Sequence, residues 1–212
     1  GMNIHRNPLC GRNFEYYSED PLLAGMMAAA MTLGVQKVPG CGTTIKHFAC
    51  NNQEDNRMGS DSVLSERALR EIYLKGFEIA VKNSQPMSIM TSYNQINGVH
   101  AANSYDICTK AARDEWGFAG AIMTDWTTTT ASTAGVCTAA GCMRAGNDMG
   151  MPGVKADHDN IRQELKEGTL EPGALQRCIC NTVSLALQSN QYEDAVSYGS
   201  QFDGLGTYMT VE

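Results

Sequence analysis

The strongest constraint on the fold is an alternation of short apolar segments with longer helical patterns along the chain. Short apolar runs bounded by turn residues are typical of buried strands, and amphipathic spacing is typical of helices. Five segments have a strand-like composition: the first five residues, 43–45, 87–92, the run ending at 125, and 145–152. Strands that alternate with helices form right-handed βαβ units around a parallel sheet. The sequence therefore predicts an α/β fold with parallel strands.

Helices are expected where capping residues precede apolar positions spaced by three and four. Asp20 and Pro21 are suited to open the first helix. Ser60 or Asp61 is expected to cap the most strongly amphipathic one. The predicted helices run over 20–35, from Ser60 or Asp61 to about 85, over 104–116, through the Ala-rich stretch after 131, and near 157–168 and 171–189.

The length of the chain limits the architecture. A closed (β/α)8 barrel typically takes about 250 residues, whereas this chain has 212. The pattern fits an open α/β sheet, or part of a barrel whose first units are not in the sequence. Residues 1–190 are predicted to form this domain, and the Tyr-, Ser- and Gly-rich residues 191–212 to form an irregular tail.

Composition and charge exclude several classes of protein. The net charge of -7 at pH 7 argues against nucleic acid or an anionic membrane surface as a partner. No apolar run reaches membrane-spanning length and no signal-like segment opens the chain, so a cytoplasmic location is expected. The eight scattered cysteines form no Cys-x-x-Cys pair and have no nearby His pair. We therefore expect reduced, mostly buried thiols, no metal site and no cofactor.

Polar side chains stand at the ends of three consecutive predicted strands. Lys46 and His47 follow the second, Tyr93 follows the third, and Asp125 ends the fourth. Parallel strands place their carboxyl ends at one edge of the sheet, where α/β proteins build their sites. Each residue also has a simpler interpretation: a solvated lysine, a core histidine, a packed tyrosine, and an aspartate that caps the next helix. The convergence of all four favours a functional site.

These residue types suit the binding and cleavage of a sugar. Lys46 and His47 can donate hydrogen bonds to hydroxyl groups, and Arg12 and Arg57 can do the same. Trp126 offers a flat apolar face for a pyranose ring. An ionised aspartate beneath an anomeric carbon is a nucleophile for retaining glycoside cleavage. The pattern thus predicts glycoside chemistry centred on Asp125.

Several short motifs carry a resemblance to a known family. In chain order they are Gly11-Arg12-Asn13-Phe14-Glu15 with Ser18-Glu19-Asp20-Pro21, Lys46-His47-Phe48-Ala49, Asn56-Arg57, Thr91-Ser92-Tyr93-Asn94 with Asn97-Gly98, and Met123-Thr124-Asp125-Trp126. In order and spacing, from the first residues to about Pro152, the chain resembles the barrel domain of glycoside hydrolase family 3 of the β-glucosidase type. The resemblance implies a partial (β/α)8 barrel and the hydrolysis of terminal, non-reducing β-D-glucosyl or xylosyl residues.

The resemblance also implies roles for individual residues. Asp125 is the expected catalytic nucleophile, and Trp126 is expected to line the innermost sugar subsite. The remaining subsite residues, expected to hold the sugar, are Arg12, Lys46, His47, Arg57 and Tyr93.

The chain departs from the family pattern in ways that affect its expected function. The first βα units of the family barrel are not seen, and the general acid/base of the β-glucosidase type comes from a separate α/β-sandwich domain. The loop 50–55 contains no histidine, which disfavours the N-acetylhexosaminidase branch, although Glu54 is a conceivable substitute acid. We expect a glycosidase fragment, weak or inactive alone, that forms homo-oligomers or needs the missing domain. The alternative is a non-catalytic module that binds a sugar or a partner.

Overall fold

A computed structural model describes residues 1–131 and 137–189 of the chain, and the predicted tail 191–212 lies outside them. Its main sheet contains four parallel strands in the order β1 (Thr44–Phe48), β3 (Ser88–Thr91), β6 (Ala121–Trp126) and β7 (Met149–Met151). The spatial order follows the chain order, so each βα unit adds its strand to the same side of the sheet. This confirms the predicted α/β fold with parallel strands; a closed barrel of this type has eight.

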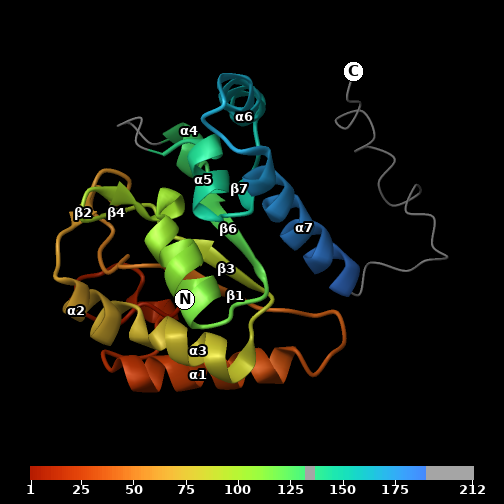
Figure 1. Ribbon diagram of the computed structural model, residues 1–212. Helices are drawn as coiled ribbons and strands as arrows, with labels where there is room; N and C mark the ends of the chain where they lie inside the picture. The colour runs from red at the N-terminus through yellow and green to blue at the C-terminus, as the bar shows by residue number, and fades with distance from the viewer. Residues whose placement is uncertain (132–136, 190–212) are drawn as a thin grey trace.

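Helices and short turns connect the strands (Figure 1). Figure 1 shows α1 and α3 side by side below the sheet, with α5, α6 and α7 above and beside β6 and β7. A small second sheet joins β2 (Asp61–Ser62), β4 (Gln95–Ile96) and β5 (Val99–His100). The α-helices are α1 (Pro21–Val35), α2 (Glu66–Ala68), α3 (Lys75–Ser84), α4 (Thr128–Ala131), α5 (Ala139–Ala145), α6 (Lys155–Glu167) and α7 (Pro172–Gln188). Two π-helices, η2 (Leu69–Tyr73) and η4 (Asp106–Glu115), and two short 3-10 helices, η1 (Asn13–Glu15) and η3 (Ala101–Asn103), complete the set in the described residues.

The first helix begins as its sequence predicts. The Asp20 carboxylate accepts a hydrogen bond from the Leu22 amide at 2.8 Å, and Pro21 occupies the first helical position. Gly25 lets α1 approach α3 closely, because a side-chain carbon there would lie 2.8 Å from the Gly76 carbonyl oxygen. This close crossing fixes the two helices against each other beneath β1 and β3.

The predicted start of the next helix is wrong. Asp61, one of the two predicted caps, instead lies in β2, which pairs with β4. The Asn97 side chain holds Leu64 through hydrogen bonds to its amide and carbonyl groups, which keeps the preceding chain extended. Ser65 is the cap, and its hydroxyl accepts from the Ala68 amide at 3.2 Å. A long-range strand pairing therefore overrides a local capping signal.

The first residues also differ from the prediction, because they form no assigned strand. They lie beside β1, where the Met2 amide donates to the Lys46 carbonyl at 2.7 Å. The Asn3 side chain donates to the His47 carbonyl and accepts from the His47 amide, both at 2.9 Å. The strand β1 is longer than the predicted 43–45 and includes Lys46 and His47. The amino-terminal segment thus supports the site strand through one backbone hydrogen bond and the two bonds of the Asn3 side chain.

Two apolar clusters form the core. In the larger one, the Phe48 ring packs against Phe77 and Trp116 with centroids 5.0 and 5.8 Å apart, between the sheet and α3 and η4. The smaller cluster joins α5 to α7 and contains Met143, Leu170 and several thiols. Six cysteines are buried, which agrees with the expectation of mostly buried thiols: Cys10, Cys50, Cys108, Cys137, Cys142 and Cys178.

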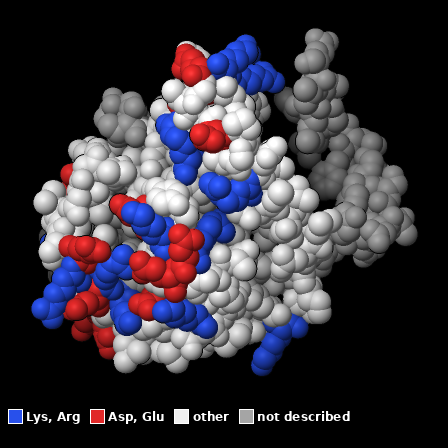
Figure 2. Space-filling view, viewed as in Figure 1, with Lys and Arg blue, Asp and Glu red and all other residues white. Residues whose placement is uncertain are grey.

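Charged side chains of both signs gather on one outer face, over α2 and α3 (Figure 2). They pair with one another: Arg70 contacts Glu66 at 2.9 Å and Glu115 at 2.6 Å. Paired charges of opposite sign are typical of a solvated protein surface. Across residues 1–131 and 137–189, no helix is both long enough and apolar enough to span a membrane.

Candidate functional site

His47 and Asp125 meet at the carboxyl ends of the strands. His47 lies in β1 and Asp125 in β6, and the His47 Nε2 is 3.4 Å from the Asp125 Oδ2. Both residues are buried. The other carboxylate oxygen of Asp125 accepts from the Trp126 amide at 2.7 Å. The carboxylate is therefore oriented by its neighbours in the sheet, and its hydrogen bond to Trp126 differs from the predicted alternative of a cap for α4.

His47 is held as a neutral imidazole. Burial lowers its pKa from 6.5 to about 3, and the positive charges of Arg12 and Lys46 add to that effect. A neutral ring that carries its proton on Nε2 turns an N–H group, and not a lone pair, toward the Asp125 carboxylate. His47 is thus buried, as the simpler interpretation of a core histidine expects. Its ring, however, faces the Asp125 carboxylate and not only apolar side chains.

Glu15 joins two of the predicted sugar-binding cations. Its carboxylate lies 2.5 Å from the Arg12 Nε and 3.6 Å from the Lys46 Nζ. Burial alone raises the pKa of Glu15, but the Arg12 hydrogen bond and the nearby positive charges lower it to about 2. Glu15 is therefore a permanent anion that holds Arg12 and Lys46 together. Sequence reasoning missed this role, although the three-residue spacing from Arg12 was a usable signal.

Arg57 is held by a second carboxylate and by an aromatic ring. Its Nη1 lies 2.6 Å from the Glu54 Oε2, and its guanidinium carbon lies 4.6 Å from the centroid of the Tyr93 ring. The Glu54 Oε1 accepts from the Asn51 side chain at 2.9 Å. With both oxygens engaged as acceptors, Glu54 serves to position Arg57, and this geometry does not support the suggestion that it is a substitute acid.

Tyr93 and Trp126 complete the group of predicted residues. The Tyr93 hydroxyl donates to the Trp126 carbonyl at 2.8 Å. Burial and the negative charge of Asp125 raise the pKa of Tyr93 to about 12, so the phenol stays protonated. Trp126, by contrast, is 58% exposed at the end of β6. The site thus has a buried carboxylate, a protonated phenol and an accessible indole beside it.

The predicted residues contact one another in small groups. His47 contacts Asp125, Arg57 stacks on Tyr93, and Glu15 links Arg12 to Lys46. Guanidinium, ammonium and phenol groups that lie near a buried carboxylate can donate hydrogen bonds to a polyhydroxylated ligand. In the described part of the chain, no group of three or more His, Cys, Asp or Glu side chains is arranged to hold a metal ion.

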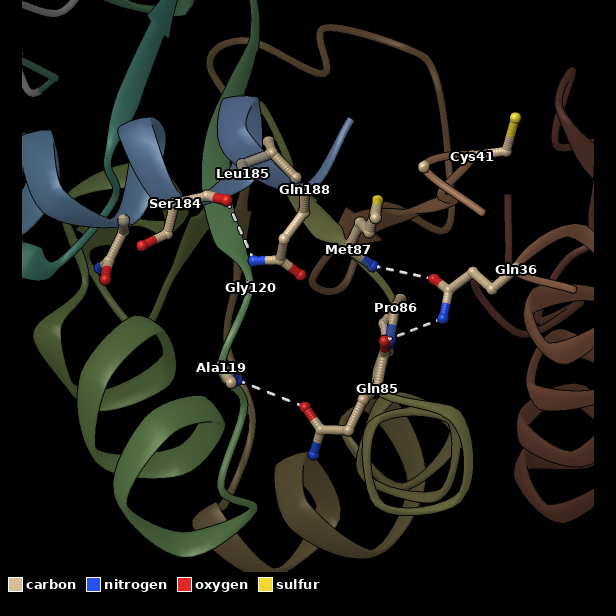
Figure 3. Close-up of a pocket in the computed structure, with 12 residues that line it drawn as sticks. Gln36, Cys41, Gln85, Pro86, Met87, Ala119, Gly120, Ser184, Leu185 and Gln188 are labelled. Atoms are coloured by element: carbon tan, nitrogen blue, oxygen red, sulfur yellow. Dashed lines mark hydrogen bonds between the residues drawn. The ribbon is translucent and has the colours of Figure 1, made fainter. Parts of the chain in front are cut away.

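A cavity of about 260 Å³ lies at the opposite ends of the strands (Figure 3). Met87 and Gly120, which immediately precede β3 and β6, line it. Figure 3 shows Gln36 and Gln85 bonded to backbone groups there: Gln36 accepts from the Met87 amide at 3.1 Å, and Gln85 accepts from the Ala119 amide at 3.3 Å. The two glutamine side chains thus connect neighbouring loops through hydrogen bonds. Asp125 does not line this cavity.

Comparison with known proteins points to one family. Residues 2–179 match the model of the glycosyl hydrolase family 3 N-terminal domain. A beta-glucosidase from Ruminococcus albus is 49% identical over 199 residues, which are 90% of this chain and 20% of that protein. An exo-alpha-(1->6)-L-arabinopyranosidase from Bifidobacterium breve is 46% identical over 87% of this chain and 23% of that protein.

A solved structure shares the fold. Beta-glucosidase 3B from Thermotoga neapolitana, in complex with alpha-D-glucose, superposes with a TM-score of 0.83 at 46% identity, over 90% of this chain and 27% of that one. The chain spans about a fifth to a quarter of the length of these relatives. From the family match over 2–179 and these identities, the chain belongs to glycosyl hydrolase family 3 and matches its N-terminal domain.

Proposed function

We propose that the protein is a retaining glycoside hydrolase in which Asp125 is the nucleophile. The single observation that supports this most is the setting of the Asp125 carboxylate. It is buried at the end of β6, and each of its oxygens lies near one donor, the His47 ring and the Trp126 amide. Preorganised donors hold a nucleophile in its attacking orientation, which lowers the barrier to reaction.

The proposed reaction has two steps. An Asp125 oxygen attacks the anomeric carbon, and the bond from that carbon to the leaving-group oxygen breaks as a general acid protonates that oxygen. Water then attacks the glycosyl ester, which restores the anomeric configuration and frees Asp125. Arg12, Lys46 and Arg57 would bind hydroxyl groups of the sugar, and Trp126 would lie against its ring.

The general acid is proposed to come from outside the described residues. Retaining cleavage needs a second carboxyl group about 5–5.5 Å from the nucleophile. Glu15 and Glu54 each hold an arginine, and the low pKa of Glu15 leaves it without a proton to donate at neutral pH. The relatives are four to five times longer than the matched segment, so a further domain of the protein is the proposed source. A second copy of the chain is the other source.

The proposed substrate is a terminal β-D-glucosyl group, with a pentopyranosyl group as the second candidate. The beta-glucosidase relative favours the first, and the similar identity of the L-arabinopyranosidase relative favours the second. Xylose falls in the same class as arabinopyranose, because both lack the exocyclic hydroxymethyl group of glucose. The ring size is shared, which agrees with an indole face for stacking.

Trapping of the intermediate tests the proposal. The protein is incubated with an activated aryl fluoroglucoside, whose leaving group departs without protonation, so a missing general acid does not block the first step. We expect a covalent fluoroglucosyl adduct on the peptide that contains Asp125, and none on the Asp125→Asn variant. Asp114→Asn is the matched control on the same tryptic peptide and keeps the adduct.

A different outcome would favour the non-catalytic alternative. If glucose binds equally to the wild type and to Asp125→Asn, and no adduct forms, the chain is a sugar-binding module. One observation favours this alternative: Glu15 pairs with Arg12 and Glu54 pairs with Arg57, so neither glutamate is free to act as the general acid.

A further inference from the structure

A second cluster of reactive side chains lies in the smaller core, apart from the residues assigned to glycoside chemistry. The thiols of Cys137 and Cys142 each lie 3.2 Å from one atom, the Oδ1 of Asn103. Two sulfur atoms that share an acceptor at this distance cannot be far from each other. Both cysteines are buried, as is the neighbouring His100.

The start of α5 explains why the two thiols meet. Thr138 caps this helix, and its hydroxyl accepts from the Gly141 amide at 3.0 Å. Cys137 precedes the cap and Cys142 is the fourth helical residue. These two positions lie in contact across a helix start, where a pair of apolar residues commonly packs as a hydrophobic staple. Here the staple positions are occupied by two thiols.

Polar groups aimed at the pair distinguish it from simple apolar packing. Gly141 leaves room for the Asn103 amide, since a side-chain carbon at Gly141 would lie 2.3 Å from the Asn103 Nδ2. The His100 Nδ1 accepts from the Ala102 amide at 3.2 Å, so the proton of a neutral His100 ring is on Nε2. That nitrogen is left to donate toward Cys137.

These neighbours favour a thiolate at Cys137. The interaction with Cys142 is the largest influence, and together with the neighbouring His100 it lowers the pKa of Cys137 against the opposing effect of burial. The pKa of Cys142 is raised, so this thiol keeps its proton. Cys137 is thus the sulfur that is deprotonated more readily, and Cys142 is the thiol beside it.

We propose that Cys137 and Cys142 form a peroxide-sensitive thiol pair, in which Cys137 is oxidised first and Cys142 closes a disulfide. The Cys137 thiolate attacks one oxygen of hydrogen peroxide, the O–O bond breaks, and a sulfenic acid forms as hydroxide leaves and takes a proton to become water. The Cys142 sulfur then attacks the Cys137 sulfur, and the sulfenic hydroxyl leaves as a second water. Two thiols are oxidised and one peroxide is reduced.

Peptide mapping tests the pair directly. The native protein is treated with hydrogen peroxide, unfolded, alkylated and cleaved with trypsin. Residues 114–144 form one tryptic peptide with both cysteines, and 83–110 form another in which Cys108 is the only cysteine. We expect the first peptide to become two hydrogens lighter and resistant to alkylation, and dithiothreitol to reverse this.

Cys108 is the matched buried control. Its side chain is fully buried, and burial raises the pKa of its thiol to about 12. The pair is expected to react at least about tenfold faster than Cys108, because the thiolate is the nucleophile. Cys180, which is exposed, reports that peroxide is active.

Single substitutions separate the two roles. In Cys142→Ser the reaction should stop at a Cys137 sulfenic acid that dimedone captures. In Cys137→Ser the Cys142 thiol should remain open to alkylation. The proposal is overturned if Cys137 and Cys142 stay reduced while Cys180 is oxidised, if they react no faster than Cys108, or if Cys142 is oxidised as fast without Cys137.

Discussion

The His47 ring reaches the Asp125 carboxylate across an intervening strand, with 3.4 Å between Nε2 and Oδ2. Their strands, β1 and β6, are not neighbours, because β3 lies between them in the sheet. The contact therefore depends on the register of two strand pairings at once. The contact joins β1 to β6 at the edge where the three strands end. It also explains how His47 can be buried and still face the Asp125 carboxylate.

The acid stability of the protein is expected to depend on His47. Its pKa is about 3 in the folded state against an ordinary 6.5, so between these values the unfolded chain binds more protons. Stability should therefore rise with pH from about 3 to 6.5 and be lost as pH falls through that window. Urea unfolding of His47→Gln should show a flatter pH dependence there, since the amide can donate but does not titrate.

His158→Gln is the control for this prediction, because His158 is an exposed residue of α6. It should leave the pH profile unchanged. A His47→Gln profile as steep as that of the wild type would contradict the assignment of the window to His47.

Glu15 is predicted to act on sugar affinity through Arg12 and Lys46. Glu15→Gln keeps the size of the side chain but removes the charge that holds both cations. We expect glucose to bind about tenfold more weakly, the loss typical of one charge-assisted hydrogen bond. Isothermal titration checks this, with Glu19→Gln, at an exposed position nearby, as the neutral control. Equal affinities in the two variants would refute the role.

Arg57 and Glu54 are expected to act as one unit. Arg57→Lys removes the planar group that both stacks on Tyr93 and meets Glu54, so binding should weaken by about tenfold. Glu54→Gln should weaken binding less, and the double variant should lose less than the two losses together, as residues in contact do. A double-mutant cycle on glucose affinity measures this coupling. Strict additivity would mean that Glu54 does not position Arg57.

Asp148 is predicted to be important for stability. Its buried carboxylate lies 2.5 Å from the Arg113 Nη2, and it accepts from the Ile122 amide at 2.7 Å and from Asn181 at 2.9 Å. Burial raises the pKa of Asp148 despite Arg113, so the pair costs desolvation to form. Removing one charge leaves the other unpaired, and Asp148→Asn should lower the free energy of unfolding by about 3–5 kcal/mol.

The control for Asp148 is an exposed ion pair of the same kind. Asp159 contacts Lys155 at 2.5 Å on the surface of α6, and exposed pairs contribute little. Asp159→Asn should leave the urea midpoint nearly unchanged. A similar shift of the urea midpoint in Asp148→Asn and Asp159→Asn would contradict the prediction that the buried ion pair contributes more to stability than the exposed one.

Much of the fold was predictable because helix caps and short apolar runs are recognised from residues that are close together in the sequence. Pro21 after Asp20 opens α1 as expected, and the short apolar runs before His47, Tyr93 and Asp125 lie in or at the strands. The start of the second helix was not predictable, since Asp61 pairs with a strand more than thirty residues away. A capping residue can be recognised from its neighbours, whereas a strand partner cannot.

By itself, the sequence determined most of the strand and helix pattern, the family motifs and the candidate site residues. Only the tertiary structure decided their partners: His47 with Asp125, Glu15 with Arg12 and Lys46, and Cys137 with Cys142 through Asn103. The physical reason is the sequence separation over which each kind of interaction acts. Helix caps and apolar periods act within a few residues, but a contact between distant side chains depends on strand order, register and burial together.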